Sequence, residues 1–168
     1  ERDVFKTICL TTVIDKEDKM ADKSKLGMEF APYTFEVEKG KIAEFAMAIY
    51  QKENKDQISP LYADREAAKK AGYKDIIAPP TFQTSFPLWA SGGLMPIVQE
   101  LSINLIRLLH GEEEYNYLGA IHPGDIMTGQ SKVVEMYDKE KKDKPGKFME
   151  FTVIETEIRN QLGELVIK

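Results

Sequence analysis

Three short segments between residues 56 and 82 decide the fold of this chain of 168 residues. They read DQISPLY (56–62), AAKKAGY (67–73) and IIAPPTF (76–82). Gly72 predicts the end of a short helix over about residues 64–71, because glycine readily adopts the left-handed backbone that closes helices. Pro79 and Pro80 then precede an apolar stretch, and proline is tolerated in the first turn of a helix. The segments therefore predict a short helix, a proline-rich turn and the start of a second helix.

The second helix carries aromatic side chains at helical spacing, as expected for a helix covered by a sheet. Its apolar positions are Phe82, Phe86, Leu88 and Trp89. Pro87 removes one backbone hydrogen bond, which predicts a kinked or shortened helix near residues 83–91. Apolar faces of this kind are more often core than ligand pocket. We therefore interpret these residues mainly as core, with Phe82, nearest the start of the helix, as the best candidate to line a pocket.

The rest of the chain predicts an α+β protein. Phe5, Ile8, Cys9 and Thr12 share helical spacing and predict an N-terminal helix, followed by a charged connector over residues 15–25. Alternating apolar residues predict a strand over 33–37, and i, i+3, i+4 spacing predicts an amphipathic helix over 42–50. Further strands are predicted over 107–117, 126–137, 147–158 and 165–168, with turns at 123–125 and 160–163 and a solvated loop over 138–147. Helices followed by antiparallel strands are typical of an α+β fold.

Composition excludes several classes of function. The chain is 42% apolar and 30% charged, as soluble globular proteins are, and its net charge of −5 gives no reason to expect a nucleic-acid partner. No apolar run approaches the ~20 residues of a membrane span. Cys9 is the only cysteine, which excludes an intrachain disulfide and fits a reducing compartment. We therefore expect a cytoplasmic protein that binds neither membranes nor nucleic acids.

The three segments resemble the active-site region of the MaoC-like (R)-specific enoyl-thioester hydratases and dehydratases. That family carries Asp-x-Asn-Pro-x-His, a helix ending in Ala-x-x-x-Gly-Phe/Tyr, and an Ile-Ala-His-Gly turn. Residues 109–115 and 121–125 are similar to its N-terminal, FAS1-like dehydratase branch, which includes substrate-binding subunits of mycobacterial-type hydroxyacyl-carrier-protein dehydratases. The resemblance implies a hot-dog fold over residues 27–168, an antiparallel sheet wrapped around a long central helix. Residues 1–26 would then form the N-terminal helix and connector.

The resemblance also implies that the hydration machinery is incomplete. In the family the Asp and His hold water and move protons, while a backbone N–H at the helix start polarises the thioester carbonyl. Pro60 matches the family proline, which places Gln57 at the aspartate and Tyr62 at the histidine. Gln57 cannot take a proton, and tyrosine, with an unperturbed pKa of about 10, is a poor base. Pro80 stands at the glycine and has no N–H to donate.

We therefore expect a subunit that binds an acyl-CoA or acyl-ACP thioester in fatty acid metabolism. The resemblance implies that its substrate-binding residues are Gln57, Tyr62, Pro80, Thr81 and Phe82. A partner subunit with an intact Asp/His motif would perform the (R)-specific hydration or dehydration. Pairing of hot-dog domains covers exposed strand edges, so a homodimer or a heterodimer is expected, and a heterodimer better explains the lost residues. No metal or redox cofactor is implied.

Two other hypotheses remain open. One is a self-sufficient hydratase that uses Asp56, next to Gln57, or His110, which stands beside Glu112 on a predicted strand. The other is a non-catalytic, acyl-CoA-binding regulatory domain. Ordinary structural roles compete with the first hypothesis: a solvated loop for Asp56, a hydrogen bond within the sheet or an interface for His110, and a turn for His122.

Overall fold

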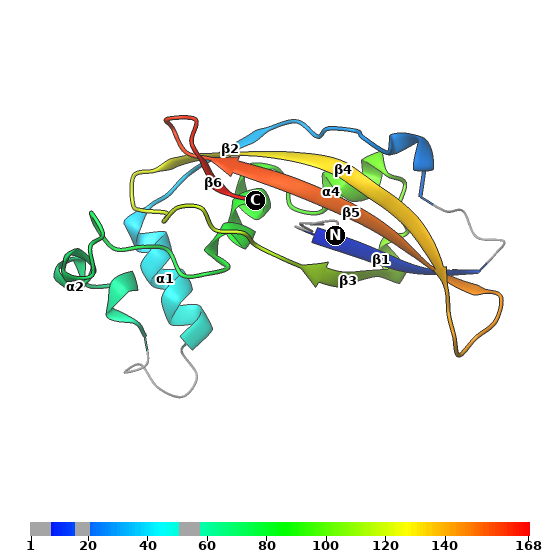
Figure 1. Ribbon diagram of the computed structural model, residues 1–168, viewed down its shortest axis with the longest axis horizontal. Helices are drawn as coiled ribbons and strands as arrows, with labels where there is room; N and C mark the ends of the chain where they lie inside the picture. Colours follow the sequence, from blue (N-terminus) through cyan, green and yellow to red (C-terminus); the bar gives the residue numbers. More distant parts are fainter. Residues whose placement is uncertain (1–7, 16–20, 51–57) are drawn as a thin grey trace.

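The computed structural model describes residues 8–15, 21–50 and 58–168. Its strands are β1 Ile8–Asp15, β2 Tyr33–Glu36, β3 Leu108–Glu113, β4 Ile126–Glu140, β5 Lys147–Arg159 and β6 Leu165–Ile167. They form one antiparallel sheet in the order β2-β4-β5-β1-β3, and β6 pairs with the end of β5 (Figure 1). β4 and β5 are the longest strands and pair with each other as a hairpin. The strands predicted over 126–137 and 147–158 are confirmed.

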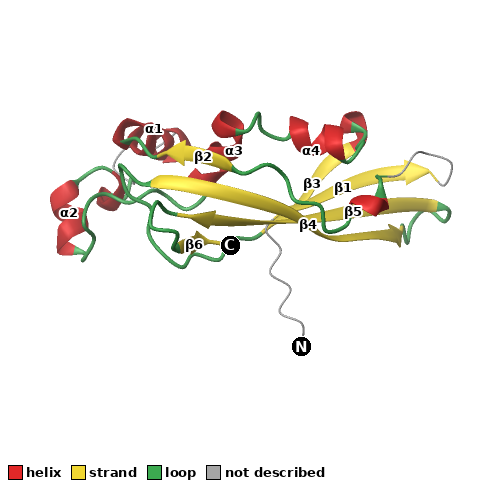
Figure 2. Ribbon diagram, turned by 90° about the horizontal axis from the view of Figure 1, so that it is seen from above, coloured by secondary structure: helices red, strands yellow, loops and turns green. Residues whose placement is uncertain are grey.

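The helices are short. Their bounds are α1 Lys39–Tyr50, α2 Arg65–Lys70, α3 Ser85–Ala90 and α4 Met95–Glu100. In Figure 2, α1, α3 and α4 lie along one side of the sheet. Asp64 caps α2 by accepting hydrogen bonds from the backbone N–H groups of Glu66 and Ala67, and Gly72, with φ of 95°, ends the turn that follows. The predicted helix over residues 64–71 is therefore confirmed. None of the helices in the described ranges has the length and apolar character of a bilayer span.

Aromatic side chains form the main core between the helices and the sheet. Phe82 and Phe86 are both buried and meet edge to face, with 5.6 Å between ring centroids. Phe35 of β2 stacks on Phe86 at 4.5 Å, and Phe45 of α1 meets Phe82 at 5.4 Å. Such contacts add to the burial of apolar area. The interpretation of Phe82 and Phe86 as core is confirmed.

The predicted hot-dog fold is confirmed, but the central helix is divided. Phe82–Thr84 forms a 3-10 turn, α3 ends at Ala90, and α4 follows as a separate helix that the sequence pattern did not predict. Pro87 lies in the first turn of α3, where proline is tolerated, and the Gly92-Gly93 pair with positive φ redirects the chain after the helix. Leu88 and Trp89 are 65% and 73% exposed, so the predicted apolar face holds only for its first half.

The predicted N-terminal helix is wrong for residues 8–15, which form β1 between β5 and β3. The segment reads ICLTTVID and is rich in β-branched residues, which favour strands. Its i, i+3, i+4 apolar positions were too few to distinguish a helix from a strand. Phe5 and residues 16–20 of the predicted connector lie outside the described residues, whereas Lys23–Lys25 forms a 3-10 turn. The division of the chain at residue 27 remains a prediction.

Candidate functional site

The three deciding segments come together beside a cavity. Backbone hydrogen bonds join Ile77 N to Leu61 O at 3.0 Å and Ala78 N to Ile121 O at 2.9 Å, which fixes the segment before α3 against two distant turns. A cavity of about 390 Å³, here called the loop cavity, opens between them. It is lined by Tyr62, Tyr73, Ile77, Ala78, Pro79, Pro80, Tyr117, Leu118, Gly119, Ala120 and Ile121. The positions that match the family motif at Tyr62 and Pro80 therefore share one cavity, whereas Asp56 and Gln57 lie outside the described residues.

Tyr62 is poorly suited to act as a base. It follows Ser59 and Pro60 in a 3-10 turn, in which the Ser59 hydroxyl accepts a hydrogen bond from Leu61 N. Its ring stacks against Tyr50 with 6.3 Å between centroids. Partial burial raises the pKa of Tyr62, and the neighbouring Tyr50 raises it further. The phenol therefore keeps its proton at neutral pH and can only donate or accept a hydrogen bond.

The N–H at the helix start is already used within the protein. Pro80 has no N–H, and Thr81, in the left-handed region with φ of 79°, directs its N–H to the hydroxyl oxygen of Tyr117 at 3.1 Å. Gln83 Nε2 donates to the same oxygen at 2.6 Å. The hydroxyl oxygen of Tyr117 thus accepts two hydrogen bonds, one of them from the N–H at the start of the helix. Phe82, the remaining predicted pocket residue, points into the core instead.

Tyr117 and Gln83 were missed by sequence reasoning. Tyr117 lies 36 residues after Thr81, at the end of a predicted strand, and nothing in its local sequence marks it. Gln83 stands between Phe82 and Thr84, in a segment that also contains Thr81 and Ser85, so its polarity does not mark it either.

A second, mostly apolar cavity of about 410 Å³ lies between α3, α4 and the sheet, and is here called the interior cavity. It is lined by Tyr33, Gln83, Thr84, Pro87, Leu88, Gly93, Leu94, Ile97, Leu105, Leu108, His110, Glu113, Tyr115, Ser131, Ile154, Thr156 and Ile158. Gln83 lines this cavity and also bonds Tyr117, which lines the loop cavity, so the two cavities are neighbours.

His110 lines the interior cavity, and its carboxylate neighbour is Glu113 rather than Glu112. His110 Nε2 lies 3.6 Å from Glu113 Oε2. The pairing of β1 with β3 shifts between Cys9 and Leu10, so that Gly111 is an extra residue in β3. An extra residue inverts the alternation of side chains that follow it, which turns Glu112 away from His110 and brings Glu113 to its side. The structure does not bring His110 into the loop cavity with Tyr62.

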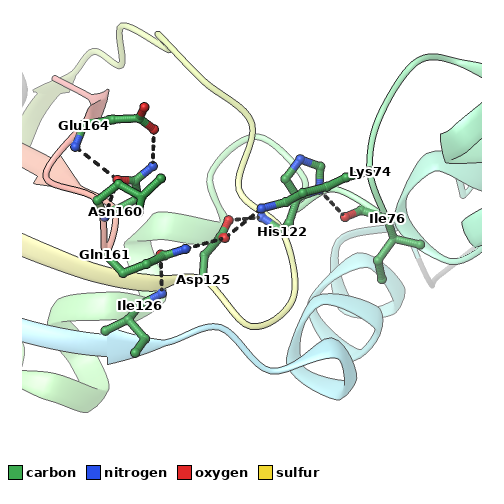
Figure 3. A network of polar contacts seen from close by, with 9 residues as sticks. Lys74, Ile76, His122, Asp125, Ile126, Asn160, Gln161 and Glu164 are labelled. Carbon is green, nitrogen blue, oxygen red and sulfur yellow. Dashed lines mark hydrogen bonds and ion pairs between the residues drawn. The ribbon is translucent and has the colours of Figure 1, made fainter.

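A buried polar network holds the loop cavity in place (Figure 3). Asp125, 6% exposed, accepts hydrogen bonds from His122 N at 2.7 Å, Lys74 Nζ at 3.1 Å and Gln161 Nε2 at 3.4 Å. His122 Nδ1 lies 3.0 Å from Ile76 O, and since a carbonyl only accepts, Nδ1 carries the hydrogen. His122 is therefore more than the predicted turn residue. Its buried ring fixes the segment that leads to Pro79 and Pro80.

Nothing in the described ranges forms a metal centre, because no three His, Cys, Asp or Glu side chains are grouped there in a way that could hold an ion.

A single antiparallel sheet around a divided central helix, with a proline-rich turn at the helix start, defines a hot-dog domain of the MaoC-like hydratase and dehydratase class. Residues 24–168 match the FAS1-like, dehydratase domain region, and the chain belongs to this family. A UPF0336 protein of Thermobifida fusca is 33% identical over 136 residues, which are 81% of this chain and 80% of that protein.

Two solved structures share the fold. The C-terminally truncated HadBC (3R-hydroxyacyl-ACP dehydratase) complex from Mycobacterium tuberculosis contains a chain with a TM-score of 0.66 and 19% identity, covering 85% of this chain and 91% of that one. The MaoC-like dehydratase from Rhodospirillum rubrum has a TM-score of 0.57 and 18% identity, covering 92% of this chain and 90% of that one. At these identities the likeness shows a common fold.

Proposed function

We propose that this chain is the acyl-thioester-binding subunit of an (R)-specific enoyl hydratase or 3-hydroxyacyl dehydratase. It binds the acyl group of acyl-CoA or acyl-ACP, and a second hot-dog subunit with an intact Asp/His motif performs the chemistry. The observation that carries the proposal is the pairing of an apolar interior cavity with a loop cavity that lacks acid–base groups. The interior cavity, of about 410 Å³, lies within the usual size of ligand pockets, about 300–1,000 Å³.

The loop cavity supports binding better than catalysis. Syn hydration needs a group that takes a proton from water and a donor for the thioester oxygen. Among the described residues that line this cavity there is no His, Asp or Glu. Burial keeps Tyr62 protonated, Pro80 has no N–H, and the N–H of Thr81 bonds Tyr117.

A partner subunit is supported by the edge of the sheet. β3 is the last strand of the sheet order, and its only strand partner in the described part of the chain is β1. Leu109 on this strand is 54% exposed, and Ile106 just before it is 95% exposed. A strand edge without a partner in the described part of the chain favours the addition of another strand. The HadBC structure, a complex, offers a precedent for heteromeric pairing in this fold.

The test measures hydration and binding with the same protein. Purified chain is incubated with trans-2-enoyl-CoA substrates of several lengths, and binding of saturated acyl-CoA is measured by calorimetry. We expect binding without turnover, and turnover after addition of a hot-dog subunit that carries Asp-x-Asn-Pro-x-His. Binding without turnover in the presence of every such subunit would favour a regulatory domain instead.

A matched pair of variants locates the acyl group. Leu94 lines the interior cavity, whereas its neighbour Met95 does not and is similarly exposed. Leu94→Trp fills the cavity and should weaken acyl-CoA binding by about tenfold or more, since that loss corresponds to about 1.4 kcal/mol of contact. Met95→Trp should leave binding unchanged. Equal binding by both variants would place the acyl group elsewhere.

One observation favours a second function. The His110–Glu113 pair in the interior cavity could in principle move a proton, as a self-sufficient hydratase would require. That hypothesis predicts turnover by the chain alone, lost in His110→Ala. Turnover that persists in His110→Ala would direct attention to Asp56.

A further inference from the structure

The hydroxyl of Tyr33 makes no hydrogen bond within the described part of the chain. Tyr33 is 9% exposed and lines the interior cavity. Burial, with no contribution from a hydrogen bond, raises the pKa of Tyr33 to about 12, so the phenol keeps its hydrogen at neutral pH. A buried phenol usually has a hydrogen-bond partner, and one without a partner can bind an acceptor that a ligand brings.

The position of this hydroxyl places it on the floor of the interior cavity. Its oxygen lies over Gly129 of β4. Ser131, two residues further along the same face of the strand, and Ile158, which pairs with Gly129, both line the cavity. The oxygen is not one of the fully enclosed polar atoms without a partner, which in the described ranges belong to Thr11, Gln83 and Glu150. It is therefore open to the cavity.

The other hydroxyls that line this cavity already have partners. Hydrogen bonds within the protein engage the hydroxyls of Thr84, Tyr115, Ser131 and Thr156. Thr84 donates to a backbone carbonyl, Tyr115 donates to Glu113, and the remaining two bond each other at 2.8 Å. Among the described side chains that line the cavity, the phenol of Tyr33 is thus the hydroxyl whose hydrogen-bonding capacity is unused.

The Tyr33 hydroxyl also lies where two cavities of different polarity meet. A cavity of about 510 Å³, here called the side cavity, adjoins the interior cavity. Both are lined by Tyr33, Pro87, Gly93, Ile97 and Ser131. The lining of the side cavity is more polar and includes Glu29 and Glu100, whereas the interior cavity is mostly apolar. An acyl thioester is divided in the same way, because its thioester group joins an apolar acyl chain to a polar pantetheine arm.

We propose that the Tyr33 hydroxyl donates a hydrogen bond to the thioester carbonyl oxygen, with the acyl chain in the interior cavity and the pantetheine arm in the side cavity. The carbonyl is an uncharged acceptor, so a neutral phenol can satisfy it among apolar side chains. Ion pairs with Lys132 and Lys25 offset the charges of Glu29 and Glu100 beside the uncharged arm. This inference rests on the proposed function as an acyl-thioester-binding subunit, and it names the residue that recognises the thioester itself.

The experiment compares a saturated acyl-CoA with the S-alkyl-CoA of equal chain length, in which a methylene group replaces the carbonyl, by calorimetry on the full chain. Tyr33→Phe keeps the ring over Gly129 and removes only the hydroxyl. We expect it to weaken acyl-CoA binding about tenfold and to leave S-alkyl-CoA binding unchanged. Tyr115→Phe is the matched control in the same cavity and should not distinguish the two ligands, because its hydroxyl donates to Glu113.

Infrared spectroscopy observes the carbonyl directly. With ¹³C at the thioester carbon, the C=O stretching band of the bound ligand should lie at a lower frequency than that of a simple thioester in hydrocarbon, because a hydrogen bond weakens the C=O bond. Tyr33→Phe should shift this band to higher frequency, and Tyr115→Phe should leave it in place.

The outcomes separate this inference from the proposed function. If no acyl-CoA binds, the proposed function and the inference both fail. If acyl-CoA binds but Tyr33→Phe weakens both ligands equally or neither, or if Tyr115→Phe acts in the same way as Tyr33→Phe, the inference alone is overturned. Circular dichroism verifies that each variant is folded. Should Tyr33→Phe not fold, the band of the wild-type complex decides, and a frequency equal to that in hydrocarbon overturns the inference.

Discussion

The ring of Tyr33 lies directly over Gly129. The two residues are paired across β2 and β4, and a Cβ atom at Gly129 would lie 2.2 Å from Cζ of Tyr33 and 2.4 Å from its hydroxyl oxygen. Tyr33 is buried, lines the interior cavity, and its burial raises the pKa to about 12. Glycine is required here to make room for a side chain rather than to permit an unusual backbone angle.

Gly129→Ala should therefore destabilise the protein by about 1–3 kcal/mol, as overpacked core substitutions do. Thermal or urea unfolding measures the change. Gly40→Ala is the matched control, because no atom lies within 4 Å of a Cβ at Gly40 in the first turn of α1, and alanine there should not destabilise the protein. Tyr33→Leu in the Gly129→Ala background should recover part of the loss. Equal stability of Gly129→Ala and wild type would contradict the overlap.

Thr81→Gly should stabilise the protein by about 1 kcal/mol. Thr81 is a β-branched residue at φ of 79° and makes no side-chain cap hydrogen bond, so its left-handed backbone is strained. Glycine removes this strain, although part of the gain is offset by its greater freedom in the unfolded chain. Ser102→Gly, at φ of 55° and not β-branched, should gain less. A lower melting temperature for Thr81→Gly than for wild type would refute the strain.

Substitutions of Asp125 and Lys74 should differ in their cost to stability, because the side chain of Asp125 is buried and that of Lys74 is exposed. Asp125→Ala leaves the buried His122 N without its acceptor and should cost about 2–4 kcal/mol in urea unfolding. Lys74→Met removes only a side chain that is 63% exposed, and should cost less than about 1 kcal/mol. The Asp125 variant should also weaken acyl-CoA binding, because the segment before Pro79 loses its anchor. Similar losses for both variants would mean that the network acts through the Lys74 ion pair.

The buried carboxyl of Glu150 should make the stability of the protein depend on pH. Burial raises the pKa of this carboxyl, against the opposing hydrogen bond from Ala21 N at 2.9 Å, and Asp138 across the strand pair raises it further. A raised pKa in the folded state means that stability is greatest below the unfolded pKa of about 4 and declines as pH rises through the folded value.

Glu150→Gln should remove this decline. The stability of Glu150→Gln relative to wild type should therefore increase between about pH 4 and pH 7, as measured by urea unfolding at each pH. Lys139→Gln, at an exposed position of the same hairpin, provides the control for a general effect of charge. A pH-independent difference between Glu150→Gln and wild type would show that the carboxyl titrates normally.

The C-terminal strands and the helices α1 and α2 could be predicted from sequence because their signals are local. Alternation defines β5, and Asp64 and Gly72 mark the two ends of α2. β1 could not be identified in this way. Its hydrogen bonds go to β5 and β3, more than 90 residues further along the chain, and short apolar runs fit both helix and strand.

The candidate site was predictable only in outline. Motif spacing placed Tyr62 and Pro80 together, and they do line one cavity. Tyr117 and Gln83 depend on a contact between a loop and the start of a helix, which has no local signature. The His110–Glu113 pair depends on a bulge at Gly111. Regular alternation of side chains along the strand predicted Glu112 as the neighbour of His110.

The position of β1 between β5 and β3 has a consequence for biosynthesis. Ile8 pairs with Ile154 and Asp15 with Lys147, so β1 leaves the ribosome long before its main partner strand, β5, exists. At about 5–20 residues per second this interval lasts on the order of ten seconds. Contacts between such distant residues also form slowly. β1 therefore lacks its main partner during this interval, and it is the segment that a chaperone would have to protect.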